Sequence, residues 1–135
     1  MKGGLRLPFF IGGIMSKKEY QEIFASAART ATSSATISTK SAAGLFFINV
    51  TSVTATPSVV FTIYGVSPNG STDYTILASA AITGTGLTVL RVHPQLTAAA
   101  NTIAKDVLPQ AIKVTATHAD ADSITYSMGF TGVDD

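Results

Sequence analysis

The segment His118-Ala-Asp120-Ala-Asp122 holds the residues whose types and spacing come nearest to a chemical site. An imidazole and two carboxylates at alternate positions of an extended chain point to one side and could face a single cation. A calcium loop needs more oxygen ligands, a central glycine and a distal glutamate, and none of these follows. A tight turn, in which Asp120 or Asp122 accepts hydrogen bonds from backbone amides, explains the same residues. The sequence therefore favours a turn here, and we expect neither a metal site nor a cofactor.

Other polar positions also fall short of a catalytic arrangement. Arg91 and His93 share one face at the end of an expected strand, but no nucleophile, base and orienting group accompany them. Gly84-Thr-Gly86 lacks the lysine and the following helix of a phosphate-binding loop, so a hairpin turn is expected there. Three tyrosines could stack on a sugar, although packing in the core or in turns is favoured for them: Tyr64, Tyr74 and Tyr126. We expect a protein without enzymatic activity.

The composition favours contacts between protein subunits. Charged residues make up 13% of the 135 residues and hydrophobic residues 46%, whereas soluble domains typically contain about 25% charged residues. The surface must therefore consist largely of Thr, Ser, Gly and Ala, and hydroxyl groups are cheaper to desolvate than charges. The nine Lys and Arg residues are scattered, so no specific nucleic-acid partner is expected. The absence of cysteine excludes disulfides, thiol nucleophiles and Cys-ligated zinc.

The N-terminal segment combines basic residues with an apolar stretch and superficially resembles a signal peptide. The stretch contains Pro8 and two glycines, and a charged segment rather than a small-residue cleavage site follows it. It is also too short to cross a bilayer, so no membrane partner is expected. We interpret it as an extended arm that packs on a neighbour or on the body, with a disordered tail or a start at Met15 as alternatives. The predicted anchors of this arm are Leu7, Phe9, Phe10 and Ile11.

Residues 16–29 carry a helical pattern. Ser16 and Glu19 have the spacing of a capping box, and apolar residues then recur at helical intervals. Three of these apolar residues, Tyr20, Ile23 and Phe24, join the arm as predicted interface residues. The following Thr, Ser and Ala residues up to Ala43 indicate a linker or an edge strand. We therefore predict residues 1–43 as arm, short helix and linker, and residues 44–135 as the body.

The body has the pattern of an all-β fold. Runs of β-branched and aromatic residues are separated by turn residues at the spacing of a sandwich or barrel. Asn69-Gly70 predicts a hairpin, and the long connection 94–109 predicts a crossing between sheets. We therefore expect an antiparallel β-sandwich of the Greek-key or jelly-roll-like kind. The predicted strands are Leu45–Val53, Ser58–Val66, Asp73–Ile82, Leu87–His93, Ala111–His118 and Ser123–Phe130.

Alternation within these strands predicts which residues face the core. The expected inward-facing residues are Val59, Phe61, Ile63, Ile112, Val114, Ala116, Ile124, Tyr126, Met128 and Phe130. By contrast, Leu45–Ile48 and Ser58–Ile63 are apolar on both faces. These two strands are expected to be central in the sandwich, or covered by the arm or another subunit.

Several segments of the body share features with one known family: Leu45–Val53, Val60–Pro68, Asp73–Ala78, Leu96–Asn101 with Asp106–Pro109, and His118–Tyr126. Together these segments resemble a β-rich family among the structural proteins of tailed bacteriophages. The resemblance implies a virion component, a capsid decoration (cement) protein or minor head protein on the capsid surface, made in the cytoplasm of the host bacterium. It also implies a homo-oligomer whose partners are other virion proteins, above all the major capsid protein. Residues 1–29 lie outside the resemblance.

Two other functions stay open at this point. The chain could be a tail, neck or fibre component of the same virion, because the composition does not distinguish one assembly from another. It could also be a carbohydrate-binding β-sandwich module, for which exposed tyrosines would be required. The sequence leaves undecided the location in the virion, the symmetry, the host and whether the arm binds its own kind.

Overall fold

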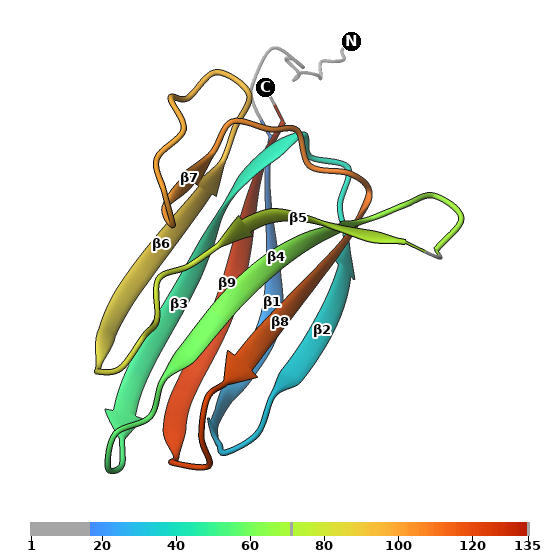
Figure 1. The fold of residues 1–135 in the computed structure, drawn as a ribbon. Helices are drawn as coiled ribbons and strands as arrows, with labels where there is room; N and C mark the ends of the chain where they lie inside the picture. Colours follow the sequence, from blue (N-terminus) through green and yellow to red (C-terminus); the bar gives the residue numbers. More distant parts are fainter. Residues whose placement is uncertain (1–16, 71, 135) are drawn as a thin grey trace, which may run out of the picture.

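The protein folds as two β-sheets packed face to face (Figure 1). The computed structural model describes residues 17–70 and 72–134. Within that part of the chain the secondary structure consists of nine strands and contains no helix. The strands are β1 (Lys17–Arg29), β2 (Ser33–Ser38), β3 (Ala43–Val53), β4 (Val59–Val66), β5 (Asp73–Ala78), β6 (Gly86–Val92), β7 (Ile103–Ala104), β8 (Ala111–His118) and β9 (Ile124–Asp134).

The strand order identifies a jelly roll. One sheet has the order β1-β9-β3-β6-β7 and the other the order β2-β8-β4-β5. Apart from the short parallel pair of β6 and β7, every pairing is antiparallel. Without β7, the two four-stranded layers are the two interlocked Greek keys of a jelly roll. The predicted antiparallel sandwich of Greek-key or jelly-roll-like kind is therefore confirmed.

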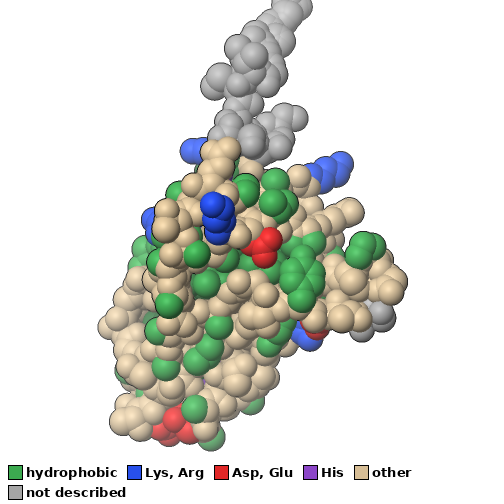
Figure 2. All heavy atoms as spheres, turned by 45° about the horizontal axis from the view of Figure 1, so that its top comes forward, with side chains coloured by type: hydrophobic (Ala, Val, Ile, Leu, Met, Phe, Trp, Pro, Cys, Tyr) green, Lys and Arg blue, Asp and Glu red, His purple; other side chains and the backbone are tan. Residues whose placement is uncertain are grey.

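The surface carries few charges, as the composition predicted. Figure 2 shows isolated blue and red side chains among uncharged atoms on the face that it draws. The described residues hold one ion pair, between Lys113 Nζ and Asp73 Oδ2 at 3.2 Å, and both side chains are 36% exposed. An exposed pair of this kind contributes about 1 kcal/mol or less to folding. Charge interactions therefore add little to the stability of the sandwich.

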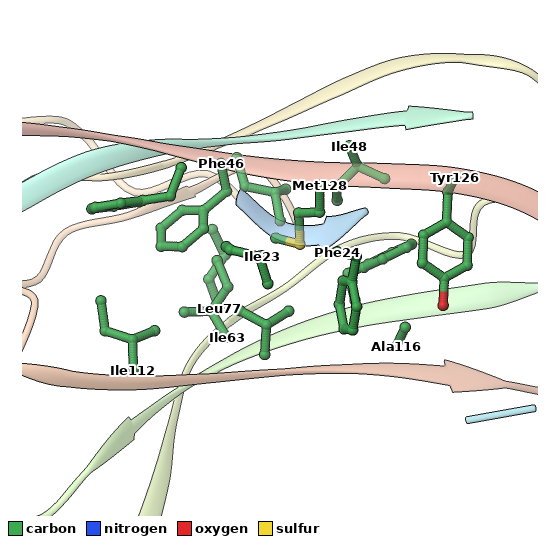
Figure 3. Close-up of a cluster of buried hydrophobic side chains, with 14 of the residues drawn as sticks. Ile23, Phe24, Phe46, Ile48, Ile63, Leu77, Ile112, Ala116, Tyr126 and Met128 are labelled. Atoms are coloured by element: carbon green, nitrogen blue, oxygen red, sulfur yellow. The ribbon is translucent and has the colours of Figure 1, made fainter. Parts of the chain in front are cut away.

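Aromatic and aliphatic side chains fill the space between the sheets (Figure 3). Tyr126 stands at one end of this core, with its ring centroid 5.0 Å from that of Phe61 and 5.8 Å from that of Phe24. Both contacts are edge-to-face, which is a favourable geometry for aromatic pairs. All ten residues predicted to face inward on β4, β8 and β9 are buried. Alternation was therefore a reliable guide to these three strands.

The helix predicted at residues 16–29 is wrong, because residues 17–29 form β1 at the edge of the five-stranded sheet. β1 pairs with β9 along its length, and a register shift between Glu22 and Phe24 places both Ile23 and Phe24 in the core. This irregularity breaks the two-residue alternation and produces apolar spacing that imitates a helix. Pairing with a distant strand thus overrides a local helical preference.

The Thr-rich segment after β1 contains β2, an edge strand that pairs with β8. The edge-strand interpretation is thus correct and the linker interpretation is not. Because β1 and β2 complete the two sheets, the predicted boundary between arm and body at residue 44 is wrong within the described part of the chain. The predicted arm anchors at residues 7–11 lie outside the described residues.

The connections agree with the sequence in two places and differ in one. The predicted Asn69-Gly70 hairpin joins β4 to β5, and Ser67 N donates to Thr72 O across it at 2.9 Å. The connection 94–109 crosses from one sheet to the other as predicted, and it also contains β7. The hairpin predicted at Gly84–Gly86 is wrong, because β5 and β6 belong to different sheets. That glycine pair lies in a crossing between the sheets.

A polar cluster fastens β1 to the segment that joins β2 to β3. The Glu19 carboxylate accepts hydrogen bonds from Thr39 Oγ1, from Ser41 Oγ at 2.9 Å and from Gln21 Nε2. Gln21 Nε2 also donates to Ser38 O at 2.6 Å. The hydrogen bond from Thr39 is the main cause of the lowered pKa of Glu19, opposed by burial and helped by Ser41 and Gln21. The cluster thus favours the ionised form of Glu19.

We expect Glu19→Gln to lower the free energy of unfolding by about 1 kcal/mol at pH 7. This value is the usual contribution of a hydrogen bond to a charged group, reduced because Glu19 is partly exposed. The folded-state pKa lies below the unfolded value of 4.5, so the stabilisation is present above pH 4.5 and is lost as the pH falls through the folded-state pKa. Urea unfolding from pH 7 to pH 3 should show the two proteins converging on acidification. A constant difference would contradict the role given to the carboxylate.

A second prediction tests the two faces of β3. Phe46 is completely buried, whereas its neighbour Phe47 is half-buried on the outer face. Phe46→Ala should lower the free energy of unfolding by about 3–5 kcal/mol, the usual cost of a core Phe→Ala change. Phe47→Ala is the matched control and should lower the free energy of unfolding by about 1 kcal/mol, since the Phe47 side chain buries less area than Phe46. Equal losses in urea unfolding would contradict the register of β3.

Candidate assembly face

The His118–Asp122 segment forms a turn between β8 and β9, as the sequence favoured. Asp122 Oδ2 accepts a hydrogen bond from Thr56 N at 3.1 Å, and Asp120 Oδ1 accepts one from Asp122 N at 3.0 Å. Both carboxylates therefore bind backbone amides. Among the described residues, no three His, Asp or Glu side chains come together in a group that could hold a metal ion.

His118 faces the buried end of the core rather than the solvent side of this turn. Its Nε2 lies 3.2 Å from Tyr126 Oη, and Ser33 Oγ lies 3.3 Å from the same oxygen. The Arg29 guanidinium stacks over the Tyr126 ring at 4.6 Å. Burial lowers the pKa of His118, Asp120 raises it and Arg29 lowers it further, while burial raises the pKa of Tyr126. This polar cluster closes one end of the sandwich.

The other candidate residues do not converge on a site. His93 Nδ1 accepts a hydrogen bond from Gln95 N at 3.0 Å, which is an ordinary contact at the end of a strand. Tyr126 lies in the core, the Tyr74 ring packs on Gly65, and Tyr64 lies near Lys113 Nζ on the outer face of β4. The three tyrosines thus have different environments. They do not form a planar row on which a sugar could stack.

The outer face of the four-stranded sheet is rich in hydroxyl groups. Ser34 Oγ and Thr115 Oγ1 lie 2.9 Å apart across β2 and β8, and Thr62 follows in the same row on β4. Thr117 on β8 is exposed on this face as well. Val60, Tyr64 and Val66 of β4 lie on the same face and are partly buried, so hydroxyl groups and apolar side chains are mixed here.

The outer face of the five-stranded sheet has a different character. Cross-strand neighbours share one side of a sheet, so the register places Leu45 beside Arg91, Phe47 beside Val89, and Leu87 beside Asn49. At the β1 edge the same side carries Tyr20, which is 77% exposed, and Leu87 is 62% exposed near the opposite side. We call this surface the apolar face; its residues are Tyr20, Leu45, Phe47, Leu87, Val89 and Val133.

A groove runs along the apolar face over β9. Its two walls come from β1, with Tyr20 and Glu22, and from β3, with Leu45 and Phe47. The floor is formed by small residues of β9, and a Cβ added at Gly129 would meet only Gln21 O at 3.7 Å. Gly129 thus leaves the floor low between two rows of larger side chains. The groove has the width of one extended chain, because one strand separates its walls.

Polar groups border this groove without filling it. Lys18 and Glu22 on β1 line one side, and Ser127 and Thr131 lie on the floor. The groove is therefore a mainly apolar cleft with a small number of polar groups at its border and on its floor. Such a surface suits a protein segment better than a small charged molecule.

The predicted interface residues divide into three groups. Tyr20 lies on the apolar face, where it could contact another molecule. Ile23 and Phe24 are wrong as interface residues, because both are buried in the core of their own chain. Leu7, Phe9, Phe10 and Ile11 lie outside the described residues.

Sequence reasoning found part of the apolar face and missed the rest. The apolar run Leu45–Ile48 was correctly expected in a central strand with two apolar faces. Leu87 and Val89 were not singled out as surface residues, although their alternation with Thr88 and Leu90 was a usable signal. The groove was not predictable, because its floor comes from β9, which is far in the sequence from the walls on β1 and β3.

Comparisons with known proteins give few matches. No protein-family model and no curated protein matches the chain. A structure of the infectious bursal disease virus Gx strain aligns with a TM-score of 0.48 at 11% identity, over 98% of this chain and 37% of that chain. A structure of the Gt strain aligns with a TM-score of 0.32 at 14% identity, over 87% and 30%. The chain thus spans about a third of the length of these viral chains. None of the described residues form a helix able to span a membrane.

A pH dependence follows from the environment of His118. Since its folded-state pKa is lowered below 6.5, the unfolded chain binds the proton more readily, and acidification below pH 6.5 should destabilise the fold. His118→Gln should therefore reduce the loss of stability between pH 7 and pH 5. Thermal unfolding of both proteins across this range measures the difference. An NMR titration midpoint of His118 above 6.5 would contradict the burial argument.

Proposed function

We propose that this protein is a non-enzymatic structural protein of a tailed-phage virion, a capsid decoration or minor head protein that acts through contacts between subunits. The observation that supports the proposal most directly is the apolar face of the five-stranded sheet. The resemblance of the body to phage structural proteins supplies the class of particle. The jelly roll is compatible with it, because viral capsid proteins use this fold, as do lectins and cupins. Fold alone does not assign the function.

The contrast between the two sheets favours one face as the contact surface. Tyr20 and Leu87 are exposed on one sheet, whereas the outer face of the opposite sheet mixes Ser and Thr residues with Val60, Tyr64 and Val66 of β4, which are partly buried. Burying apolar area yields about 25 cal/mol per Å² before ordering costs are subtracted. Side chains held on a sheet lose less freedom on binding than side chains of a loop. The apolar face therefore offers favourable burial at low ordering cost.

The low charge of the chain suits assembly in many copies. With a formal net charge of +1, neighbouring subunits would repel one another weakly. We propose that the partners are further copies of this chain and other virion proteins, the major capsid protein above all. A tail, neck or fibre position would use the same surface chemistry, so the location in the particle is the decisive measurement.

Cryo-electron microscopy of purified particles from the source tests the proposal. We expect density for this chain on the outer surface of the icosahedral shell. Density only at the portal vertex or tail would replace the decoration role with a neck or tail role. Absence of the chain from particles would overturn the virion function and return attention to carbohydrate binding, which glycan-array binding would then measure.

A variant tests the apolar face directly. Leu87→Asp places a charge on an exposed position of this face, so the fold should persist while binding to particles that lack the protein falls at least tenfold. Binding should weaken because the introduced carboxylate would lose its contacts with water when the interface forms. Thr117→Asp makes the same charge change on the opposite sheet and serves as the control. Sedimentation of particles with each purified variant measures binding, and equal binding of both variants would contradict the use of this face.

A further inference from the structure

The groove on the apolar face has the dimensions and lining of a site for one extended protein segment. Its β1 wall extends from Lys18 to Phe24, about 20 Å along a strand. Leu45 and Phe47 form the other wall, and Gly129 leaves the floor open between them. A segment lying here would bury apolar side chains against both walls. Its chain would cross the outer face of the sheet without adding to the sheet edge.

The same chain contains a segment that matches this groove. Sixteen residues precede Lys17, and residues 7–15 include an apolar run with Phe9, Phe10 and Ile11. Extended, these nine residues span about 26 Å, slightly more than the β1 wall. Residues 7–15 carry no charged side chain, and the groove is bordered by one basic and one acidic residue, Lys18 and Glu22. The segment and the groove therefore agree in length and in apolar character.

We propose that residues 7–15 of one copy bind in the groove of a second copy, with Phe9, Phe10 and Ile11 as anchors. The inference deepens the proposed assembly function and rests on it. It names the partner as another copy of this chain and the contact as arm to groove. Such a contact joins two different surfaces, so repetition around an axis closes a ring. Reciprocal exchange between two copies would give a dimer instead.

Chain length favours the second copy over the groove of the same chain. Gly12-Gly13 is the natural point for a tight reversal before β1. A hairpin centred there would bring Leu7 back only as far as Lys18, at the end of the groove. The aromatic anchors would then lie beyond the sheet, and the walls from Tyr20 to Phe24 would stay unfilled. A neighbouring groove has no such restriction, because sixteen extended residues reach up to about 53 Å.

Cysteine cross-linking of the full-length protein tests arm and groove together, because the natural chain has no cysteine. Gly12→Cys marks the arm beside its anchors, and Ser127→Cys marks the groove floor. When the two variants are mixed and mildly oxidised, we expect a disulfide-linked heterodimer. Thr117→Cys on the opposite sheet is the matched control and should give at least tenfold less product.

The cross-linking outcomes separate the possible contacts. An intramolecular disulfide in the diluted Gly12→Cys/Ser127→Cys double variant, without heterodimer in the mixture, would overturn the second copy as the partner. Equal cross-linking to Ser127→Cys and Thr117→Cys would overturn the groove as the site. Loss of cross-linking together with intact incorporation into particles would reject this inference and leave the proposed function in place. If the two variants cross-link but the protein is absent from particles, the arm-to-groove contact would be supported and the proposed virion function would be rejected.

A groove-filling variant gives an independent measurement. Gly129→Leu places a side chain on the groove floor, where space is available and the backbone conformation suits any residue. We expect the fold to persist and self-association, measured by light scattering, to weaken at least tenfold. Thr117→Leu adds the same side chain to the opposite sheet and should leave self-association unchanged. Unchanged self-association of a folded Gly129→Leu protein would overturn the proposal.

Discussion

The pairing of β9 with β1 on one side and β3 on the other is the constraint on which the rest of the structure depends. The last strand of the chain thereby joins the first to the middle of the five-stranded sheet. Its inward side chains, Tyr126, Met128 and Phe130 among them, supply much of the core. Its outward side is made of small residues around Gly129, which form the floor of the groove. One strand therefore determines both the stability of the sandwich and the shape of its apolar face.

Polar side chains reinforce this arrangement at two ends of the sandwich. Glu19 binds the segment between β2 and β3, so β1 is held to the body by hydrogen bonds as well as by strand pairing. At the other end, Arg29 and His118 surround the Tyr126 ring. His118 and Tyr126 were candidates for metal or sugar binding in the sequence, and in the structure they pack against Arg29 and each other at the end of the core.

The two outer faces of the sandwich differ in chemistry. Hydroxyl groups are common on the four-stranded sheet, whereas the exposed Tyr20 and Leu87 lie on the five-stranded sheet. In a jelly roll the same β-strand alternation that builds the core also sets the chemistry of each outer face. Substituting residues on one outer face should therefore change the chemistry of that face without disturbing the core.

The sequence by itself determined six of the nine described strands, the inward residues of β4, β8 and β9, the Asn69-Gly70 hairpin and the jelly-roll-like class, because alternation and turn chemistry are local signals. It misassigned β1, since an irregular register near Phe24 imitates helical spacing and the energy that selects the strand comes from pairing with distant β9. Only the tertiary structure decided that Ile23 is core, that Tyr20 is surface and that a groove lies over Gly129. Those properties depend on the pairing of β1 with β9, two strands that are far apart in the sequence. Local sequence does not determine which strands become neighbours in a sheet.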